Sequence, residues 1–203
     1  MSKSFKVHEL WPTPIYENYI EVKPDWVNKS KTFEYERMYS NNGDYTKNKK
    51  ILNELPDLKH EIFKNVILFT EKYLHIADIN FYFTNSWVVK HYPNDWAQTH
   101  NHTNSLLSGV YYLETEQNSG DLCFESNNVN NLFPNAVFPN FKEYNYTTGG
   151  QIKMKVDMGK LYLFPSHIFH QVLKNKTNKI RYSLAFNLFC KGSFGKDEFE
   201  LKL

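Results

Sequence analysis

The sequence predicts a mainly β protein, an antiparallel sandwich or barrel with helices in its N-terminal part. From Phe81 onward the hydrophobic pattern has a period of two, and β-branched and aromatic residues dominate. Turn sequences such as Gly149-Gly150 separate many short strands with no helical pattern between them. Short strands in direct succession are typical of antiparallel β architectures.

The N-terminal part is expected to begin extended and then to form helices. Pro12 and Pro14 disfavour helix for the residues that precede them. A helix is predicted over about 24–38, because Pro24 suits the first helical position. A stronger helix is predicted over about 56–76, where apolar residues recur at spacings of three and four. We expect this second helix to buttress a sheet.

The strands follow one another closely, with one long interruption at residues 127–150. This segment is rich in asparagine and aromatic residues. A mobile surface loop and a substrate-covering flap are both open interpretations, and the number of aromatic rings favours the flap. Strands are predicted at about 81–92, 106–114, 120–126, 151–157, 160–164, 168–174 and 180–190.

Bulk properties exclude several classes of protein. A chain of 203 residues fits one domain spanning residues 1–203. The net charge of +2 suggests neither a nucleic-acid partner nor an acidic membrane partner. Two cysteines do not make a disulfide scaffold. We find no signal peptide or membrane-spanning stretch in the sequence, so we expect a cytoplasmic protein without a membrane partner.

Two histidines separated by one residue, His100 and His102, form the first part of a candidate metal site. In an extended strand their Cα atoms would lie roughly 6.5 Å apart with both side chains on one face. His170, from another strand, would complete a facial set of three with open positions, which suits non-haem Fe(II) and O2. His167 is the alternative for that third place. The remaining histidines lack such neighbours and are interpreted as structural: His8, His60, His75 and His91.

Arg181 follows eleven residues after His170 and provides a cation for the same site. A planar guanidinium forms two parallel hydrogen bonds with a carboxylate. Ser183 falls on the same strand face and can add a hydroxyl donor. The pair suits a dicarboxylic cosubstrate, with one end on the metal and the other on the arginine. An ordinary salt bridge between Arg181 and a protein carboxylate is the alternative.

These residues lie in two blocks that resemble the small 2OG-Fe(II) oxygenases of marine bacteria and phages. The first block has His-x-His at 100–102 and Leu-Ser-Gly-Val-Tyr-Tyr-Leu at 107–113. The second runs from Gly159 to Ser166, continues to His170 and ends with Arg-x-Ser-x-x-Phe-Asn at 181–187. The resemblance covers about residues 10–190. It places the chain near the prolyl-hydroxylase-like members of the 2-oxoglutarate/Fe(II)-dependent dioxygenase superfamily.

The resemblance implies a double-stranded β-helix, or jelly roll, at about 80–190, preceded by an extended segment and helices at 1–79. It implies Fe(II), 2-oxoglutarate as cosubstrate and O2. His100 and His170 would be iron ligands, and Arg181 and Ser183 would bind the distal carboxylate of 2-oxoglutarate. Two tyrosines would line that pocket: Tyr111, in the Tyr-Tyr-Leu segment, and Tyr92, in a Tyr-Pro before the first ligand.

One departure concerns position 102, where the wider superfamily has aspartate or glutamate. Three neutral histidine ligands would leave the Fe(II) site one negative charge short. His102 is favoured as the third ligand because its spacing from His100 gives it the right face. A carboxylate from a neighbouring strand, Asp121 or Glu125, is the alternative. No catalytic residue is predicted beyond the metal ligands.

The substrate cannot be read from the sequence. By analogy, hydroxylation of a C–H bond in a peptide or protein is the first hypothesis, with a small molecule as the alternative. Trp87 and Asn104 are the candidate substrate contacts, and a homodimer is left open. Two rival classes remain: a three-histidine cupin-type iron dioxygenase that does not use 2-oxoglutarate, and a non-catalytic ligand-binding jelly roll.

Overall fold

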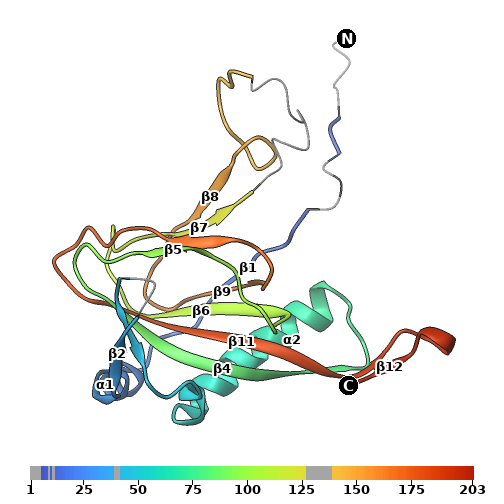
Figure 1. Cartoon of the computed structure of the whole chain (residues 1–203), viewed down its shortest axis with the longest axis horizontal. Helices are drawn as coiled ribbons and strands as arrows, with labels where there is room; N and C mark the ends of the chain where they lie inside the picture. Colours follow the sequence, from blue (N-terminus) through green and yellow to red (C-terminus); the bar gives the residue numbers. More distant parts are fainter. Residues whose placement is uncertain (1–5, 9, 11, 39–41, 127–138) are drawn as a thin grey trace.

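Two antiparallel β-sheets lie face to face in the computed structural model, which describes residues 6–8, 10, 12–38, 42–126 and 139–203 (Figure 1). The larger sheet has the order β1-β9-β6-β11-β4-β3-β2, with β12 paired to β11, and the smaller sheet has the order β5-β10-β7-β8. The larger sheet contains β1 (Tyr16–Tyr19), β2 (Tyr35–Arg37), β3 (Asp44–Thr46), β4 (Ile79–His91), β6 (Leu107–Glu114), β9 (Lys160–Pro165), β11 (Arg181–Phe194) and β12 (Leu201–Lys202). The smaller sheet contains β5 (Ala97–His100), β7 (Leu122–Glu125), β8 (Gln151–Met154) and β10 (His170–Val172). The predicted double-stranded β-helix is therefore confirmed.

The larger sheet has two different faces because successive side chains point to opposite sides. On β11, Leu184 and Phe186 point outward into the main hydrophobic core and are fully buried. Their neighbours Arg181 and Ser183 point inward, toward the smaller sheet. The inner core between the sheets is smaller and largely aromatic: Tyr112, Leu122, Phe124, Val156, Tyr162 and Phe164. The inner face therefore has room for polar groups that the outer core excludes.

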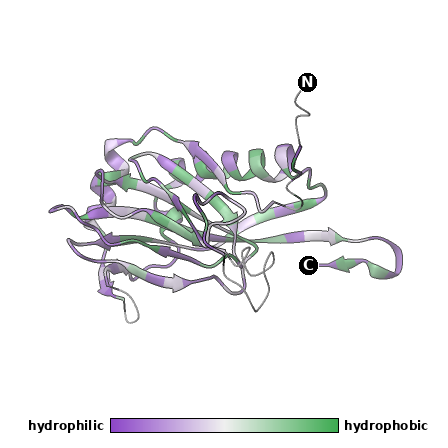
Figure 2. Cartoon of the chain, turned by 90° about the horizontal axis from the view of Figure 1, so that it is seen from above, coloured by the Kyte–Doolittle hydropathy of each residue, from purple (hydrophilic) through white to green (hydrophobic). Residues whose placement is uncertain are grey.

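Helices cover the outer face of the larger sheet (Figure 1). Helix α1 (Pro24–Thr32) and helix α2 (Pro56–Ile67) each start with proline at a first-turn position, as predicted. Leu58, Ile62 and Val66 of α2 are completely buried in the same core as the outward side chains of β11. Figure 2 shows hydrophobic residues along the central strands and recurring along the longer helix. Burial of this helix stripe stabilises the sheet that carries the inner face.

The helices differ in length from the predictions. The first ends at Thr32 rather than near Met38, and β2 begins three residues later. The second continues beyond Ile67 as a π-helical segment, η2 (Leu68–Tyr73). A short 3-10 helix, η1 (Ile51–Asn53), precedes α2, and another, η3 (Asp197–Phe199), lies between β11 and β12. These ends depend on local hydrogen bonds that apolar periodicity does not encode.

All seven predicted strands are confirmed, with end shifts of a few residues. The sequence did not reveal β5, because this strand is short and its residues, Ala-Gln-Thr-His, are mostly polar and have little preference for β structure. It also did not reveal β1, β2, β3 and β12, which are two to four residues long.

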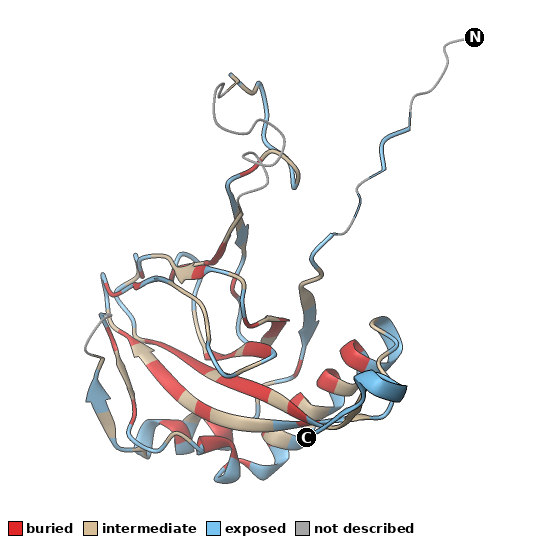
Figure 3. Ribbon diagram, turned by 45° about the vertical axis from the view of Figure 1, so that its right-hand side comes forward, coloured by how far each residue is buried: buried red, intermediate tan, exposed pale blue. Residues whose placement is uncertain are grey.

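Half of the predicted flap, residues 127–138, lies outside the described residues. Its remainder, 139–150, contains bends and turns but no strand or helix, and is mostly exposed (Figure 3). The end of β11 and the strand β12 project as a hairpin beyond the rest of the larger sheet and are also largely exposed (Figures 1 and 3). Within the described ranges, every helix is too short or too polar to cross a bilayer.

Candidate functional site

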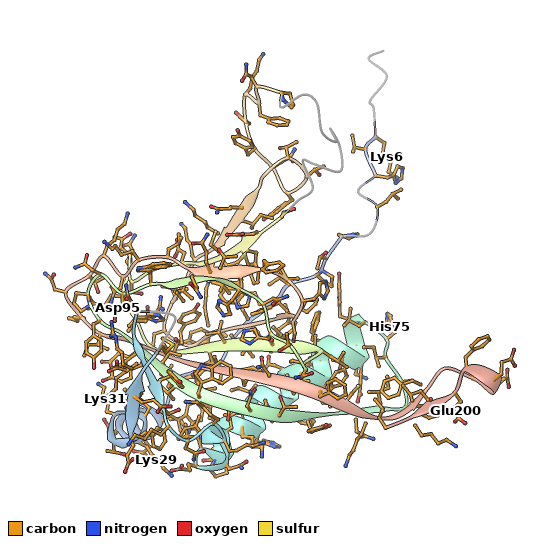
Figure 4. All side chains as sticks on the ribbon, viewed as in Figure 1. Lys6, Lys29, Lys31, His75, Asp95 and Glu200 are labelled. Carbon is orange, nitrogen blue, oxygen red and sulfur yellow. The ribbon has the colours of Figure 1, made fainter. Side chains whose placement is uncertain are left out.

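Three histidine side chains meet between the two sheets. His100 is the last residue of β5, His102 lies in the loop that follows, and His170 is the first residue of β10. His100 and His170 are direct partners across the β5–β10 ladder. One ligand atom from each of the three lies within 4.8 Å of the others. Of the other histidines, His75 lies just after η2, outside this cluster (Figure 4).

The hydrogen bonds of His100 and His170 decide which ring nitrogen is free. Nδ1 of His100 lies 2.7 Å from the carbonyl oxygen of Gln98. Nδ1 of His170 lies 3.0 Å from the carbonyl oxygen of Ile168. A carbonyl oxygen only accepts, so Nδ1 carries the proton in both rings. Nε2 of each ring therefore has a free lone pair, which is the arrangement that a metal ligand requires.

His102 is held by its main chain and by an asparagine. Its main-chain N–H donates to the carbonyl of Ser166 at 3.0 Å. Its Nδ1 lies 3.3 Å from Nδ2 of Asn187, whose Oδ1 accepts from Ser108 Oγ at 2.7 Å. An amide turned by 180° would accept from His102 through Oδ1 and donate to the Ser108 hydroxyl through Nδ2. In that orientation His102 also presents a free Nε2.

Burial keeps two rings of the cluster, His102 and His170, in the neutral form. His170 is buried beside Phe164 and Phe124, with ring centroids 4.8 and 6.1 Å away. Burial lowers the pKa of His170 to about 3, and the neighbouring His100 adds to this effect. Burial also lowers the pKa of His102 to about 4. Neutral imidazole is the form that binds metal, so protons do not compete for these two rings at neutral pH.

These low pKa values predict that acid destabilises the metal-free protein. His91, buried beside Arg181, has its pKa lowered to about 2 by burial and by that cation, so three histidines resist protonation when folded. The unfolded chain takes up these protons below pH 6.5, so the stability is complete above that pH and declines as the pH falls from 6.5 toward 4. The expected loss is about 1.4 kcal/mol per pH unit for each histidine. Urea unfolding at pH 7.5 and 5.5 measures this loss, and equal stabilities would contradict the prediction.

The donor set of the cluster fits a divalent transition metal. Three neutral imidazoles suit iron and its neighbours, and among the described residues no carboxylate or thiol joins the group. Oε1 of Glu125 instead accepts from Thr99 Oγ1 at 2.6 Å and from Gln171 Nε2 at 3.0 Å. Asp121 also lies outside the group, and His167 is exposed in the turn before β10.

Arg181 and Ser183 begin the inner face of β11, and both are buried. In the strand register Arg181 is opposite His91 on β4, and Ser183 is opposite Tyr112 on β6. Asn187 belongs to the same face, since side chains alternate along the strand. Because Asn187 contacts His102, this one face of the sheet connects the arginine with the histidine cluster.

The guanidinium of Arg181 is held by neutral groups. Nη1 donates to the carbonyls of Ser119 and Gly120 at 2.9 and 2.7 Å, and Nη2 lies 2.5 Å from Nδ1 of His91. Gly120 has φ +99°, and a Cβ there would lie 2.0 Å from the carbonyl oxygen of Leu173, so this loop conformation needs glycine. No carboxylate in the described residues lies within ion-pair distance of Arg181, so the alternative of an ordinary salt bridge is not found there.

The side chain of Tyr111 points away from Arg181. Its hydroxyl donates to the carbonyl of Ile20 at 3.0 Å, and its ring packs edge-on against Trp26 in the outer core. Alternation gives the inner place to its neighbour Tyr112, which the sequence analysis missed. The structure therefore separates Tyr111 from Arg181 and brings Tyr112 to the face where Arg181 lies.

Tyr92 is also directed away from Arg181. Its hydroxyl donates to Oδ2 of Asp44 on β3 at 2.8 Å, and this bond raises the pKa of Tyr92. Its main-chain N–H donates to the carboxylate of Asp95, which is labelled in Figure 4. The preceding residue, His91, has the inner place instead. His91 is therefore a second residue that the structure places beside Arg181 and that the sequence analysis did not connect with it.

The two predicted substrate contacts differ in position. Trp87 is half-buried on β4, and its ring centroid lies 6.0 Å from that of His102. Asn104 is exposed in the loop between β5 and β6, two residues after His102, with φ +53°. Leu106 and Phe169, which are near the histidines in the sequence, expose 43% and 52% of their surfaces.

One family of proteins matches the chain by its sequence. The family model described as "Putative 2OG-Fe(II) oxygenase" matches residues 85–187, which is just over half of the 203 residues. The matched segment contains all three histidines of the cluster as well as Arg181. No curated protein matches the sequence.

Solved structures with the same fold include three from different bacteria. An oxidoreductase of the 2OG-Fe(II) oxygenase family from Burkholderia pseudomallei has TM-score 0.56 and 10% identity, covering 81% of this chain and 76% of its own. A prolyl-4-hydroxylase from Pseudomonas putida has TM-score 0.52 and 12% identity, covering 86% and 92%. HygX from Streptomyces hygroscopicus, with nickel, 2-oxoglutarate and hygromycin B bound, has TM-score 0.58 and 9% identity, covering 87% and 82%. At these identities the likeness concerns the fold.

Proposed function

We propose that this chain, which belongs to the 2OG-Fe(II) oxygenase family, hydroxylates a C–H bond of an organic substrate. The family uses Fe(II), 2-oxoglutarate and O2. The ligands in this proposal are His100, His102 and His170, and Arg181 binds the distal carboxylate of 2-oxoglutarate. The observation that carries the proposal is the convergence of three imidazoles, two of which keep Nε2 free through hydrogen bonds of Nδ1 to main-chain carbonyls.

With Fe(II) and 2-oxoglutarate bound, O2 oxidises 2-oxoglutarate to succinate and CO2 and supplies one oxygen atom to the substrate C–H bond. The chain's own residues position these partners and exclude water. Phe124 and Phe164 shield His170 from solvent. Asn187 and Ser108 hold His102 through the amide described above.

With three histidine ligands, 2-oxoglutarate would bring negative charge to Fe(II) as well as to Arg181. Neutral ligands leave the full double positive charge of Fe(II) uncompensated by the protein. The chelating carboxylate of 2-oxoglutarate would supply one negative charge to Fe(II), and its distal carboxylate would supply one to Arg181. This match of charges favours use of 2-oxoglutarate over a three-histidine chemistry without it.

The pocket for the distal carboxylate is proposed to contain Ser183 and Tyr112 besides Arg181. All three are buried on one face of the larger sheet, and Ser183 and Tyr112 are direct partners across strands. Burial raises the pKa of Tyr112, so its hydroxyl stays protonated and can donate a hydrogen bond to an anion. Tyr111 and Tyr92 are left out of this pocket because their hydroxyls donate elsewhere.

The substrate is proposed to be a peptide or protein side chain, with a small organic molecule as the alternative. Trp87 would contact it, since its indole adjoins the ring of His102. Asn104 is the proposed polar contact, because it is exposed two residues beyond His102. A cytoplasmic location, the lack of a nucleic-acid partner and a homodimer remain predictions from the sequence.

An anaerobic titration tests the proposed function. We expect Fe(II) and 2-oxoglutarate together, but neither alone, to produce a visible charge-transfer absorption, because only the chelate forms that transition. Admitting O2 should then yield succinate in proportion to the 2-oxoglutarate consumed. O2 uptake that ignores 2-oxoglutarate would indicate the cupin-type alternative. Failure to bind Fe(II) at all would indicate a non-catalytic jelly roll.

A further inference from the structure

The partner of Arg181 on the neighbouring strand, His91, has a buried nitrogen with no hydrogen-bond partner among the described residues. Arg181 and His91 expose only 1% and 3% of their surfaces. Nδ1 of His91 lies 2.5 Å from Nη2 of Arg181, while Nε2 of His91 and Nε of Arg181 are buried and find no acceptor in the part of the chain that the structure describes. A buried N–H without an acceptor destabilises a folded protein, so each such group calls for an explanation.

The proton on His91 can be assigned from its neighbour. A guanidinium only donates hydrogen bonds, so Nδ1 of His91 must accept from Arg181. The ring is neutral because burial and the adjacent cation lower the pKa of His91 to about 2. Its single proton therefore lies on Nε2. His91 and Arg181 together offer two unsatisfied N–H donors, one on Nε2 and one on Nε.

The same end of the inner face carries a buried positive charge that has no ion-pair partner among the described residues. The hydrogen-bond partners of Arg181 are two main-chain carbonyls and the neutral ring of His91, and Asp121 acts on it only through its charge, without an ion pair. A buried cation without a direct counter-ion is costly, and an anion with several acceptor lone pairs would relieve both defects. A carboxylate has this charge and this number of acceptors.

We infer that His91 is a cosubstrate-binding residue that donates from Nε2 to the distal carboxylate of 2-oxoglutarate and holds Arg181 in position through Nδ1. This inference rests on the proposed function. The neutral ring orients the guanidinium without cancelling its charge. A carboxylate at position 91 would instead pair with Arg181 and occupy the place of the ligand, so His91 also keeps the pocket selective for an external anion.

Two nearly equal-sized variants, His91→Gln and His91→Glu, separate these roles. Glutamine keeps an acceptor and a donor, whereas glutamate introduces the competing charge. The dissociation constants of 2-oxoglutarate and of 2-oxobutanoate are measured anaerobically on the Fe(II)-loaded protein. 2-Oxobutanoate has the same chelating end and no distal carboxylate. His60→Gln, at an exposed histidine on helix α2, is the matched control.

We expect His91→Glu to weaken 2-oxoglutarate binding by about 10- to 100-fold relative to His91→Gln, which corresponds to the loss of a hydrogen bond to a charged group. Binding of 2-oxobutanoate and of Fe(II) should differ little between the two variants. Equal weakening of both 2-oxo acids would make His91 a merely structural residue and overturn the inference.

Unchanged 2-oxoglutarate binding in both variants would also overturn it, with the proposed function left intact. A wild-type protein that binds Fe(II) but shows no preference for 2-oxoglutarate over 2-oxobutanoate would overturn the assignment of the whole pocket. These results are distinguishable because the wild-type comparison does not involve His91.

Discussion

His170→Ala is expected to abolish Fe(II) binding and 2-oxoglutarate turnover. The ring of His170 supplies one of three neutral nitrogens, and the described part of the chain brings no carboxylate or thiol to the cluster that could replace it. Even residues that only orient a metal ligand typically cost about 10- to 100-fold in metal affinity when replaced, so loss of a ligand should exceed that range. The small side chain also leaves a gap between Phe124 and Phe164, which lowers stability by a few kcal/mol.

The measurement is an Fe(II) titration under anaerobic conditions, followed by an assay of succinate formation. His167→Ala is the matched control, since His167 is exposed and lies only three residues before His170. This control should bind Fe(II) and turn over 2-oxoglutarate like the wild type. An unfolding curve separates loss of the metal from loss of the fold. Turnover retained in His170→Ala would remove this histidine from the proposed metal site.

Arg181→Ala is expected to raise the KM for 2-oxoglutarate while Fe(II) still binds. Removing one partner of a buried charge pair typically costs about 2–4 kcal/mol, which is roughly 30- to 1000-fold in affinity. The KM of Arg181→Lys should lie between those of the wild type and Arg181→Ala, because lysine keeps the charge but lacks the planar guanidinium. The ligand cluster should be spared, since none of its three histidines hydrogen-bonds to Arg181.

The KM for 2-oxoglutarate and the dissociation constant of Fe(II) are measured for each variant. The chain contains one other arginine, Arg37, which is half-exposed and pairs with Asp44 and Asp95. Arg37→Ala therefore controls for the loss of an arginine as such and should leave the KM unchanged. A normal KM in Arg181→Ala would contradict the clamp role. Because Arg181 also holds the carbonyls of the 119–120 loop, thermal unfolding accompanies the assay.

The sequence was sufficient for seven of the strands and for the histidines, since both depend on local patterns. A period of two defines strands, and a His-x-His pair with a late histidine defines a candidate site. It was not sufficient to choose between Tyr111 and Tyr112. The two are adjacent, so their faces depend on the register between β6 and β11, and a shift of one residue exchanges them.

His91 was missed for a related reason. A lone histidine in an apolar strand is usually structural, and its role depends on β4 pairing with β11 so that it lies opposite Arg181. That pairing joins segments about ninety residues apart, which no local pattern predicts. Asn187 could have been found by counting every second residue along β11 from Arg181, because a strand keeps alternate residues on one face.

The anchoring of Arg181 by two peptide carbonyls has a consequence for how this protein tolerates genetic drift. The grip depends on the course of the chain at Ser119 and Gly120, and the side chain of Ser119 does not enter it. Ser119 is itself buried, so another small residue at position 119 could keep the course of the chain and the orientation of the guanidinium. Replacement of the glycine, or a change in loop length, would remove the two carbonyls from the arginine, so the identity of residue 119 alone understates the importance of this loop.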